Sequence, residues 1–188
     1  MIDKGPRAER DIDIMACSAL NPMHPPTVVS GAEHDTIYRE NCHRIYSRAF
    51  WMTDNELAAE KLSADTFVRA FSEEVRVAAE PAEQHAEQID QAFIAEMREI
   101  EPVGTLTLKC PAAENGQSIR GRMKRIHLER AVVQLPATEK LVFLMHDVEG
   151  YGHSRISRLL GIAAEESRLA LHSARMYVRK LVDCMTIR

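Results

Sequence analysis

Arginines at helical spacing near the C-terminus are the residues best suited to bind a polyanion. Arg168 and Arg175 stand two helical turns apart, so a helix would place both on one face. A guanidinium that pairs with a guanine edge discriminates against other bases by roughly 1–3 kcal/mol. Arginines outside the groove instead hold phosphates, which position a protein on DNA without reading sequence. The predicted DNA contacts are Arg155, Arg158, Arg168, Ala170, His172, Ser173, Arg175 and Arg179.

A helix-turn-helix would position these side chains. Apolar residues at spacings of three, four and seven predict a helix from about Thr138 to Glu149, and Gly150 is a stop signal. A second short helix begins near Ser154, and Gly161 supplies the tight turn before a helix from about Ala164 to Val182. In such a motif the last helix enters the major groove. For Arg179 and its neighbour Lys180, a solvated helix face is the alternative interpretation.

The middle of the chain carries a charge that disfavours DNA. The whole chain has a formal charge of −4, and residues 72–101 hold nine acidic residues against two basic ones. Neutralisation of phosphates supplies much of the affinity for nucleic acid, so this acidic segment should not lie on a DNA backbone. Within it, Ile89, Phe93, Met97 and Ile100 predict an amphipathic helix over residues 86–100. We interpret this helix as completing a bundle, with a docking face for a partner as the alternative.

Composition predicts an all-α protein with two small helical domains joined by a linker. The 188 residues are 45% hydrophobic but only 5% aromatic, and strand-like alternating runs are few. Clusters of proline and glycine mark the boundaries. We predict an N-terminal extension over residues 1–34, a helical domain over 35–101, a linker over 102–125 and a helix-turn-helix domain over 126–188.

The chain offers no pattern typical of an enzyme, a metal site or a membrane protein. Its four cysteines, Cys17, Cys42, Cys110 and Cys184, stand singly, and its eight histidines lack the spacing of zinc ligands. Nucleophile elbows and phosphate-binding loops are absent from the sequence. The apolar runs are too short to span a bilayer. We therefore predict a cytoplasmic protein that needs no cofactor, is not an enzyme and does not insert into membranes.

The C-terminal segment resembles region 4 of extracytoplasmic-function (group IV) sigma factors of bacterial RNA polymerase. This resemblance covers roughly 55 residues and implies a helix-turn-helix that recognises the minus-35 promoter element. The letters that carry it are Leu135-Pro136, Glu139, Val142-Phe143-Leu144, Asp147-Val148-Glu149-Gly150, Ile156, Leu159-Leu160-Gly161-Ile162, Leu171-His172 and Ala174-Arg175.

A second segment, from Asp35 to Phe71, resembles the first two helices of sigma region 2. In that family the second helix binds the clamp helices of the large polymerase subunit. The resemblance implies core-polymerase contacts at Glu60, Leu62, Asp65, Thr66, Phe67 and Arg69.

The chain departs from the family pattern in four places. Lys61 and Ala64 replace polar groups of the clamp-binding surface, and Glu165 and Glu166 replace small or hydroxylated residues at the start of the last helix. The segment after Phe71 lacks the letters with which the family melts and reads the minus-10 element.

The resemblance implies a DNA-binding sigma factor that directs RNA polymerase to promoters. Its partners would be core polymerase, promoter DNA and an anti-sigma factor, and the basic run Arg120–Arg125 would suit the polymerase channel. Two alternatives stay open. One is a sigma-derived regulator that acts by protein contact, as an adaptor or decoy, without melting promoters. The other is a plain helix-turn-helix regulator that binds an operator as a dimer.

Overall fold

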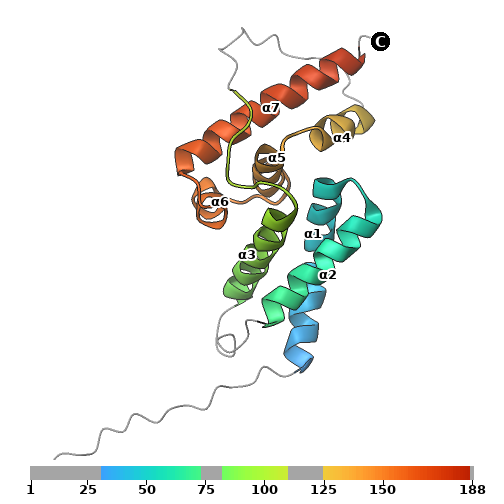
Figure 1. Cartoon of the computed structure of the whole chain (residues 1–188), viewed down its shortest axis with the longest axis vertical. Coiled ribbons are helices and arrows are strands. Elements are labelled where there is room, and N and C mark those ends of the chain that lie inside the picture. Colours follow the sequence, from blue (N-terminus) through green and yellow to red (C-terminus); the bar gives the residue numbers. More distant parts are fainter. Residues whose placement is uncertain (1–30, 73–81, 110–124, 187–188) are drawn as a thin grey trace, which may run out of the picture.

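Every regular element in the described parts of the chain is helical. The computed structural model describes residues 31–72, 82–109 and 125–186 (Figure 1). An all-α fold is thereby confirmed. The elements are α1 (Gly31–Thr53), α2 (Glu56–Ser72), α3 (Ala82–Ile100), α4 (Arg125–Val133), α5 (Ala137–Phe143), the π-helical turn η2 (Leu144–Val148), α6 (His153–Leu160) and α7 (Ala164–Thr186).

Helices α1, α2 and α3 form an N-terminal bundle. Helix α2 packs against both α1 and α3. Asn55 caps the start of α2, because its side-chain oxygen accepts a hydrogen bond from the Ala58 amide at 2.9 Å. Ile45, Phe67 and Phe93, one from each helix, are buried together in the core. The predicted amphipathic helix over residues 86–100 is confirmed as the greater part of α3.

Helices α4 to α7 form a C-terminal bundle around the long α7, which packs against α4, α5 and α6. The helix expected from Thr138 to Glu149 is present, but its second half is the π-helical turn η2. A π-helical turn contains one residue more than an α-helical turn and so changes the direction of the side chains that follow it. Asp147 and Glu149 therefore point to different partners, as described below.

The turn between α6 and α7 depends on Gly161. Its φ of +69° is left-handed, a conformation that strains other residues, and its amide donates to the Ser157 carbonyl at 2.9 Å. At the start of α7, Glu166 accepts a hydrogen bond from the Ala163 amide at 2.7 Å. This is the glutamate half of a capping box, which explains a carboxylate at this position.

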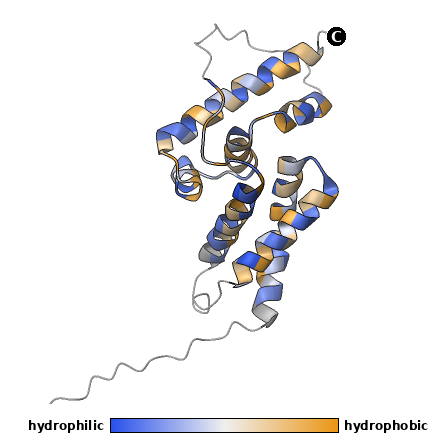
Figure 2. Cartoon of the chain, viewed as in Figure 1, coloured by the Kyte–Doolittle hydropathy of each residue, from blue (hydrophilic) through white to orange (hydrophobic). Residues whose placement is uncertain are grey.

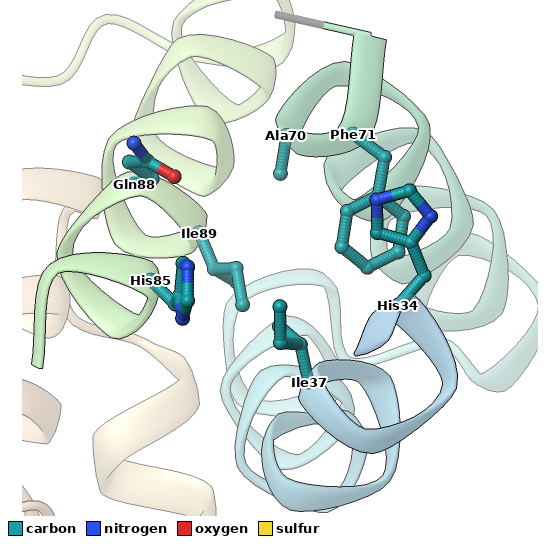
Figure 3. A pocket seen from close by; sticks show the side chains of 7 residues that line it. All are labelled: His34, Ile37, Ala70, Phe71, His85, Gln88 and Ile89. Carbon is teal, nitrogen blue, oxygen red and sulfur yellow. The ribbon is translucent and has the colours of Figure 1, made fainter. Parts of the chain in front are cut away.

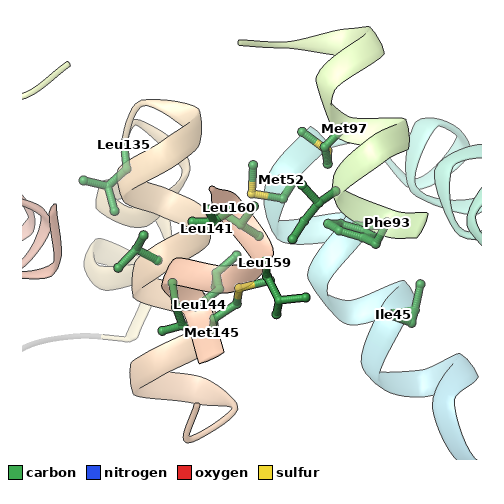
Figure 4. Packing of buried hydrophobic residues seen from close by; sticks show 14 of the residues in the cluster. Ile45, Met52, Phe93, Met97, Leu135, Leu141, Leu144, Met145, Leu159 and Leu160 are labelled. Atoms are coloured by element: carbon green, nitrogen blue, oxygen red, sulfur yellow. The ribbon is translucent and has the colours of Figure 1, made fainter. Parts of the chain in front are cut away.

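The two bundles share one continuous core (Figure 4). Met52 of α1 and Leu159 of α6 are buried where the bundles meet, between Phe93 on one side and Leu141 on the other. Figure 2 shows the same pattern as hydrophobic stripes along helices whose other faces are hydrophilic. The two groups of helices therefore pack against each other directly.

Residues after α3 cross onto the C-terminal bundle. The Gly104 amide donates to the Thr138 hydroxyl at 3.2 Å, and the amides of Thr107 and Leu108 donate to one carboxylate oxygen of Glu139 at 2.6 Å each. The first part of the predicted linker is thus fixed to α5. The rest of it, including most of the basic run up to Arg125, lies outside the described residues, as does most of the predicted N-terminal extension.

No helix in the described ranges is long and apolar enough to cross a membrane. Of the four cysteines, the structure places Cys42 and Cys184, and both are free thiols.

Truncation of the α3 core should destabilise the protein far more than truncation of its exposed end. Because the Phe93 ring is fully buried, Phe93→Ala should lower the free energy of unfolding by about 3–5 kcal/mol. Ile100 belongs to the same predicted stripe but is 58% exposed, so Ile100→Ala should cost less than about 1 kcal/mol. Urea unfolding followed by circular dichroism measures both. Equal losses would contradict this packing of α3.

Candidate nucleic-acid interface

One face of α7 presents a row of exposed basic side chains. Arg168, His172, Arg175 and Arg179 follow one another at spacings of four, three and four residues, and all are exposed. Leu169, next to this row, is also exposed. Such a face can enter a major groove, because guanidinium and imidazole groups can donate hydrogen bonds to base edges and phosphates.

Two of the predicted DNA contacts are wrong. Ala170 is 0% exposed and Ser173 is 2% exposed, so neither can meet a base in this fold. They lie on the inward face of α7 together with Leu171 and Ala174, which are buried as well. The interpretation followed the order of residues along the helix, but residues of one helix share a face only every three or four positions.

The exposed arginines of α7 already have acidic partners. Arg168 donates to Glu165 at 2.6 Å, and Arg175 donates to both carboxylate oxygens of Asp147 at 2.9 and 2.6 Å. Hydrogen bonds from Arg175 hold the pKa of Asp147 below its ordinary value. DNA would have to displace these carboxylates, but both pairs are largely exposed and so should contribute little to stability.

The arginines of α6 are held by the other bundle. Arg155 donates to Asp90 of α3 at 2.9 Å and lies over the ring of Tyr151, with the guanidinium carbon 4.1 Å from the ring centroid. Arg158, one turn further on, reaches Glu87 of α3 at 3.4 Å. Both arginines thus have partners on α3, Arg155 through a buried carboxylate and Arg158 through an exposed pair.

Asp90 is the centre of a buried charge cluster. One of its carboxylate oxygens accepts from Arg44 and from Arg48, the latter at 3.0 Å, and the other accepts from Tyr151 and Arg155 at 2.9 Å each. Its side chain is fully buried. Burial alone would raise the pKa of Asp90, but the charges of Arg48 and Arg44 and hydrogen bonds from Arg44 and Tyr151 outweigh burial, so the pKa lies below its ordinary value.

Arg48 joins this cluster to the C-terminal bundle. Its guanidinium is fully buried and donates to both carboxylate oxygens of Glu149, through Nε at 2.7 Å and through a second nitrogen. Its centre lies 5.1 Å from the centroid of the Phe93 ring, within cation–π range. Burial would lower the pKa of Arg48, yet the bond to Glu149 and the charge of Asp90 raise it, so the group stays charged.

Sequence reasoning missed this cluster, although one signal was present. Asp90 falls on the apolar stripe of the predicted helix, three residues before Phe93 and seven before Met97. A carboxylate on a buried face must find cationic partners, since an unpaired buried charge is very costly. The letters alone do not say which arginines these are, because Arg44 and Arg48 lie more than 40 residues away in sequence.

Three of the six predicted polymerase contacts are also wrong. Leu62, Thr66 and Phe67 are buried inside the N-terminal bundle. They match the family letters because those letters include core residues of the helix. Glu60, Asp65 and Arg69 remain on or near the surface, where Asp65 pairs with Lys61 and Arg69 pairs with Glu96, each at 2.5 Å.

The exposed face of α2 carries an apolar stripe that sequence reasoning overlooked. Leu57 is 75% exposed and Val68 is 66% exposed, and Lys61 and Ala64 lie between them at helical spacing. Large apolar side chains exposed in one row on a helix are typical of a surface that meets another protein. Lys61 and Ala64, the two departures from the family pattern, therefore belong to this same face.

Two hollows lie on the described surface. At the open end of the N-terminal bundle, His34 and His85 flank a cavity of about 10 Å³, closed by apolar groups such as Ile37 and Phe71 (Figure 3). It could hold about one water molecule. A wider groove of about 740 Å³ runs between the end of α1 and α4, beside Trp51 and Ile126. Among the described residues, no group of three or more histidine, cysteine, aspartate or glutamate side chains could hold a metal ion.

Comparison with known proteins identifies the C-terminal segment. Residues 125–177, which include α4, α5, α6 and the first half of α7, match the family model "Sigma-70, region 4". This confirms the resemblance of the C-terminal segment that the sequence predicted, and the helix-turn-helix just described lies within this region 4.

Solved structures share this fold. One of them is the sigma factor RpoE from Bartonella quintana, in complex with the anti-sigma factor NepR. It is 15% identical, with a TM-score of 0.55 over 80% of this chain and 97% of that chain. The likeness in fold therefore extends beyond region 4. None of the curated proteins matches the sequence significantly. The region 4 match supports a sigma-factor role in general terms.

The Asp90 cluster should give the stability of this protein a characteristic dependence on pH. Because the folded-state pKa of Asp90 is depressed, its contribution to stability is present above the ordinary aspartate pKa and is lost as pH falls through the folded value. At pH 7, Asp90→Asn should lower the free energy of unfolding by about 3–5 kcal/mol, because it leaves buried arginine charge unpaired.

The difference in the free energy of unfolding between wild type and Asp90→Asn should become smaller below about pH 4, near the ordinary aspartate pKa. Urea unfolding at a series of pH values measures it. Asp35→Asn, which breaks only an exposed pair with Arg39, is the control and should change little at any pH. A constant difference down to the lowest pH would contradict this origin of the stability.

Proposed function

We propose that this protein is a sigma factor that directs RNA polymerase to promoters, with region 4 recognising the minus-35 element. The observation that carries the proposal is the match of residues 125–177 to sigma-70 region 4, on which α7 presents an exposed basic row after the turn at Gly161. In a helix-turn-helix the second helix lies in the major groove, and α7 is that helix.

On this face we assign base contacts to Arg168, His172 and Arg175. Arginine reads a guanine edge through two hydrogen bonds, and the histidine can donate to or accept from neighbouring groups. Exposed Leu169 could in addition contact a thymine methyl group. Arg179 lies further along α7, where a contact to phosphate is the better assignment.

We assign binding of core polymerase to the exposed face of α2. Glu60, Asp65 and Arg69 supply its charged groups, and Leu57 and Val68 supply its apolar area. The apolar side chains can exclude water at the centre of such an interface, while the charged groups set its orientation.

An anti-sigma factor is a further proposed partner. The structurally similar RpoE was solved in complex with the anti-sigma factor NepR, and this chain shares that fold. We extend this kind of partner to the present protein. The proposed role needs no cofactor, and it places the protein in the cytoplasm, where polymerase and promoter DNA are found.

A second candidate is a sigma-derived regulator that acts by protein contact without melting promoters. It is favoured by one observation, the occupation of Arg155 and Arg158 by Asp90 and Glu87 of the acidic helix α3. A protein of this kind would bind core polymerase or another partner but would support no transcription. A plain helix-turn-helix regulator would neither bind core polymerase nor support transcription by it. It would bind a duplex operator without polymerase.

Removal of one base-contacting arginine should weaken promoter use. Run-off transcription with purified core polymerase over a library of promoters should give discrete transcripts with the wild-type protein. Arg168→Ala should weaken them by roughly 5- to 100-fold, the worth of one bidentate arginine–guanine contact. Arg39→Ala removes an equally charged, exposed arginine from α1 and should leave transcription unchanged. Equal transcription by both variants would reject Arg168 as a base contact.

Charges on the apolar stripe of α2 should prevent binding of core polymerase. Leu57→Glu and Val68→Glu replace exposed side chains, so the fold should tolerate them, while core binding should weaken at least about tenfold, the typical cost of a central interface residue. A pull-down with purified core measures the affinity. Ile100→Glu, an equally exposed change on α3, is the control. Retention of core by Leu57→Glu would place the polymerase surface elsewhere.

A further inference from the structure

Two carboxylates of α3 face two arginines of α6 in matched register. Asp90 and Glu87 are three residues apart on α3, and Arg155 and Arg158 are three residues apart on α6. Residues at this spacing share one face of a helix. The helices therefore meet through two parallel ion pairs, with nitrogen–oxygen distances of 2.9 Å and 3.4 Å.

Helix α6 is the first helix of the helix-turn-helix, and such a helix crosses the DNA backbone. Its arginines would then contact phosphates, which offer the same kind of anionic oxygen as a carboxylate. Arg155 donates to the buried Asp90 and lies over the Tyr151 ring, so a phosphate would have to compete with both contacts for this side chain. DNA and α3 thus require the same side chains.

We propose that α3 is an intramolecular substitute for the DNA backbone, which presents Asp90 and Glu87 to Arg155 and Arg158 and so keeps region 4 closed against promoter DNA. This inference rests on DNA binding by α6 and α7, as proposed above. It gives the acidic middle segment a function, and it makes the arrangement of the two bundles a determinant of DNA affinity.

The contact differs in kind from the ion pairs on α7. Arg168 and Arg175 pair with Glu165 and Asp147 of their own bundle, and those pairs can break without moving a helix. Asp90, in contrast, is fully buried and belongs to the other bundle, so the contact of Arg155 depends on the position of α3. Arg155 and Arg158 are therefore the predicted DNA contacts that depend on how the bundles are arranged.

Further contacts hold α3 in place. Arg98 donates to the Leu160 carbonyl at 2.9 Å, which satisfies the C-terminal end of α6. Arg48 links Asp90 to Glu149 in region 4. Separation of the bundles would expose the charges of Asp90, Arg48 and Glu149 to water, which stabilises each of them without a partner. Closure can therefore be reversible although these charges are buried in the closed form.

Two spectroscopic labels can report closure without DNA. One label on Glu40→Cys in α1 and one on native Cys184 in α7 lie on different bundles, and both positions are exposed. The other cysteines, Cys17, Cys42 and Cys110, are replaced by Ser. Pulsed electron spin resonance gives the distance between labels, and fluorescence anisotropy gives the affinity of the same full-length chain for a duplex of random sequence.

Neutralising the α3 carboxylates should open the protein and strengthen DNA binding. Asp90→Asn should add a longer distance to the distribution and tighten DNA binding roughly tenfold, as expected if about nine-tenths of the protein is closed. Glu87→Gln changes the more exposed of the two carboxylates and keeps the buried cluster intact. It should also add a longer distance and tighten DNA binding, but to a smaller extent. Glu99→Gln is the matched control, because it removes one exposed charge from the same helix.

The outcomes separate this inference from the function on which it rests. If Asp90→Asn and Glu87→Gln match Glu99→Gln in both distance and affinity, α3 does not close the protein. Tighter binding at an unchanged distance would also overturn closure. Opening without DNA binding by any form would reject region 4 as a DNA reader, and with it the competition. If circular dichroism shows that Asp90→Asn does not fold, the result for Glu87→Gln decides whether α3 closes the protein.

Discussion

A buried carboxylate determines how this protein is assembled. Asp90 is fully enclosed and accepts hydrogen bonds from Arg44, Arg48, Tyr151 and Arg155. A buried charge is tolerated only when its partners are close and well oriented. Those partners come from α1, from the segment after η2 and from α6, so α3 must lie where these three elements meet. The apolar contacts at the junction, such as Met52 against Leu159, specify this arrangement less strictly.

The short segment Asp147-Val148-Glu149 connects this cluster to α7. Asp147 holds Arg175 of α7, whereas Glu149 holds Arg48 of α1. Two acidic residues only two positions apart thus face opposite neighbours, one within region 4 and one in the other bundle. The π-helical turn η2 precedes Glu149 and sets this direction. The residues that made the sequence resemble region 4 therefore also connect the two bundles.

Helices α3, α5, α6 and α7 were predictable because each has an apolar stripe with the period of a helix, and glycines mark where two of them end. Helices α1 and α2 were expected only from the family resemblance, and α4 was not predicted. The residues of the site were predictable only in part. Arg168, His172 and Arg175 lie on the exposed face as expected, but Ala170 and Ser173 lie on the buried one. The sequence specifies the spacing of residues along a helix. It does not specify how far the helix is rotated about its axis, which packing against the rest of the bundle determines.

The same reasoning explains the errors on α2. Leu62, Thr66 and Phe67 are part of the family pattern because they build the bundle, whereas Leu57 and Val68 on the outer face were not part of any motif. A linear pattern mixes residues that fold a helix with residues that bind a partner. Burial separates the two classes, and burial is known only once the helices are packed.

The charge of a segment can be interpreted only when the position of the segment in the fold is known. Taken alone, the acidic segment that contains α3 argues against DNA binding, because its carboxylates would repel phosphates. In the fold two of these carboxylates, Asp90 and Glu87, pair with arginines of region 4. Interfaces between domains of this mixed apolar and ionic kind are typically able to open. Under the proposed closure, an acidic helix and a DNA-binding domain are compatible in one chain, because the carboxylates of α3 would leave the arginines when the bundles separate.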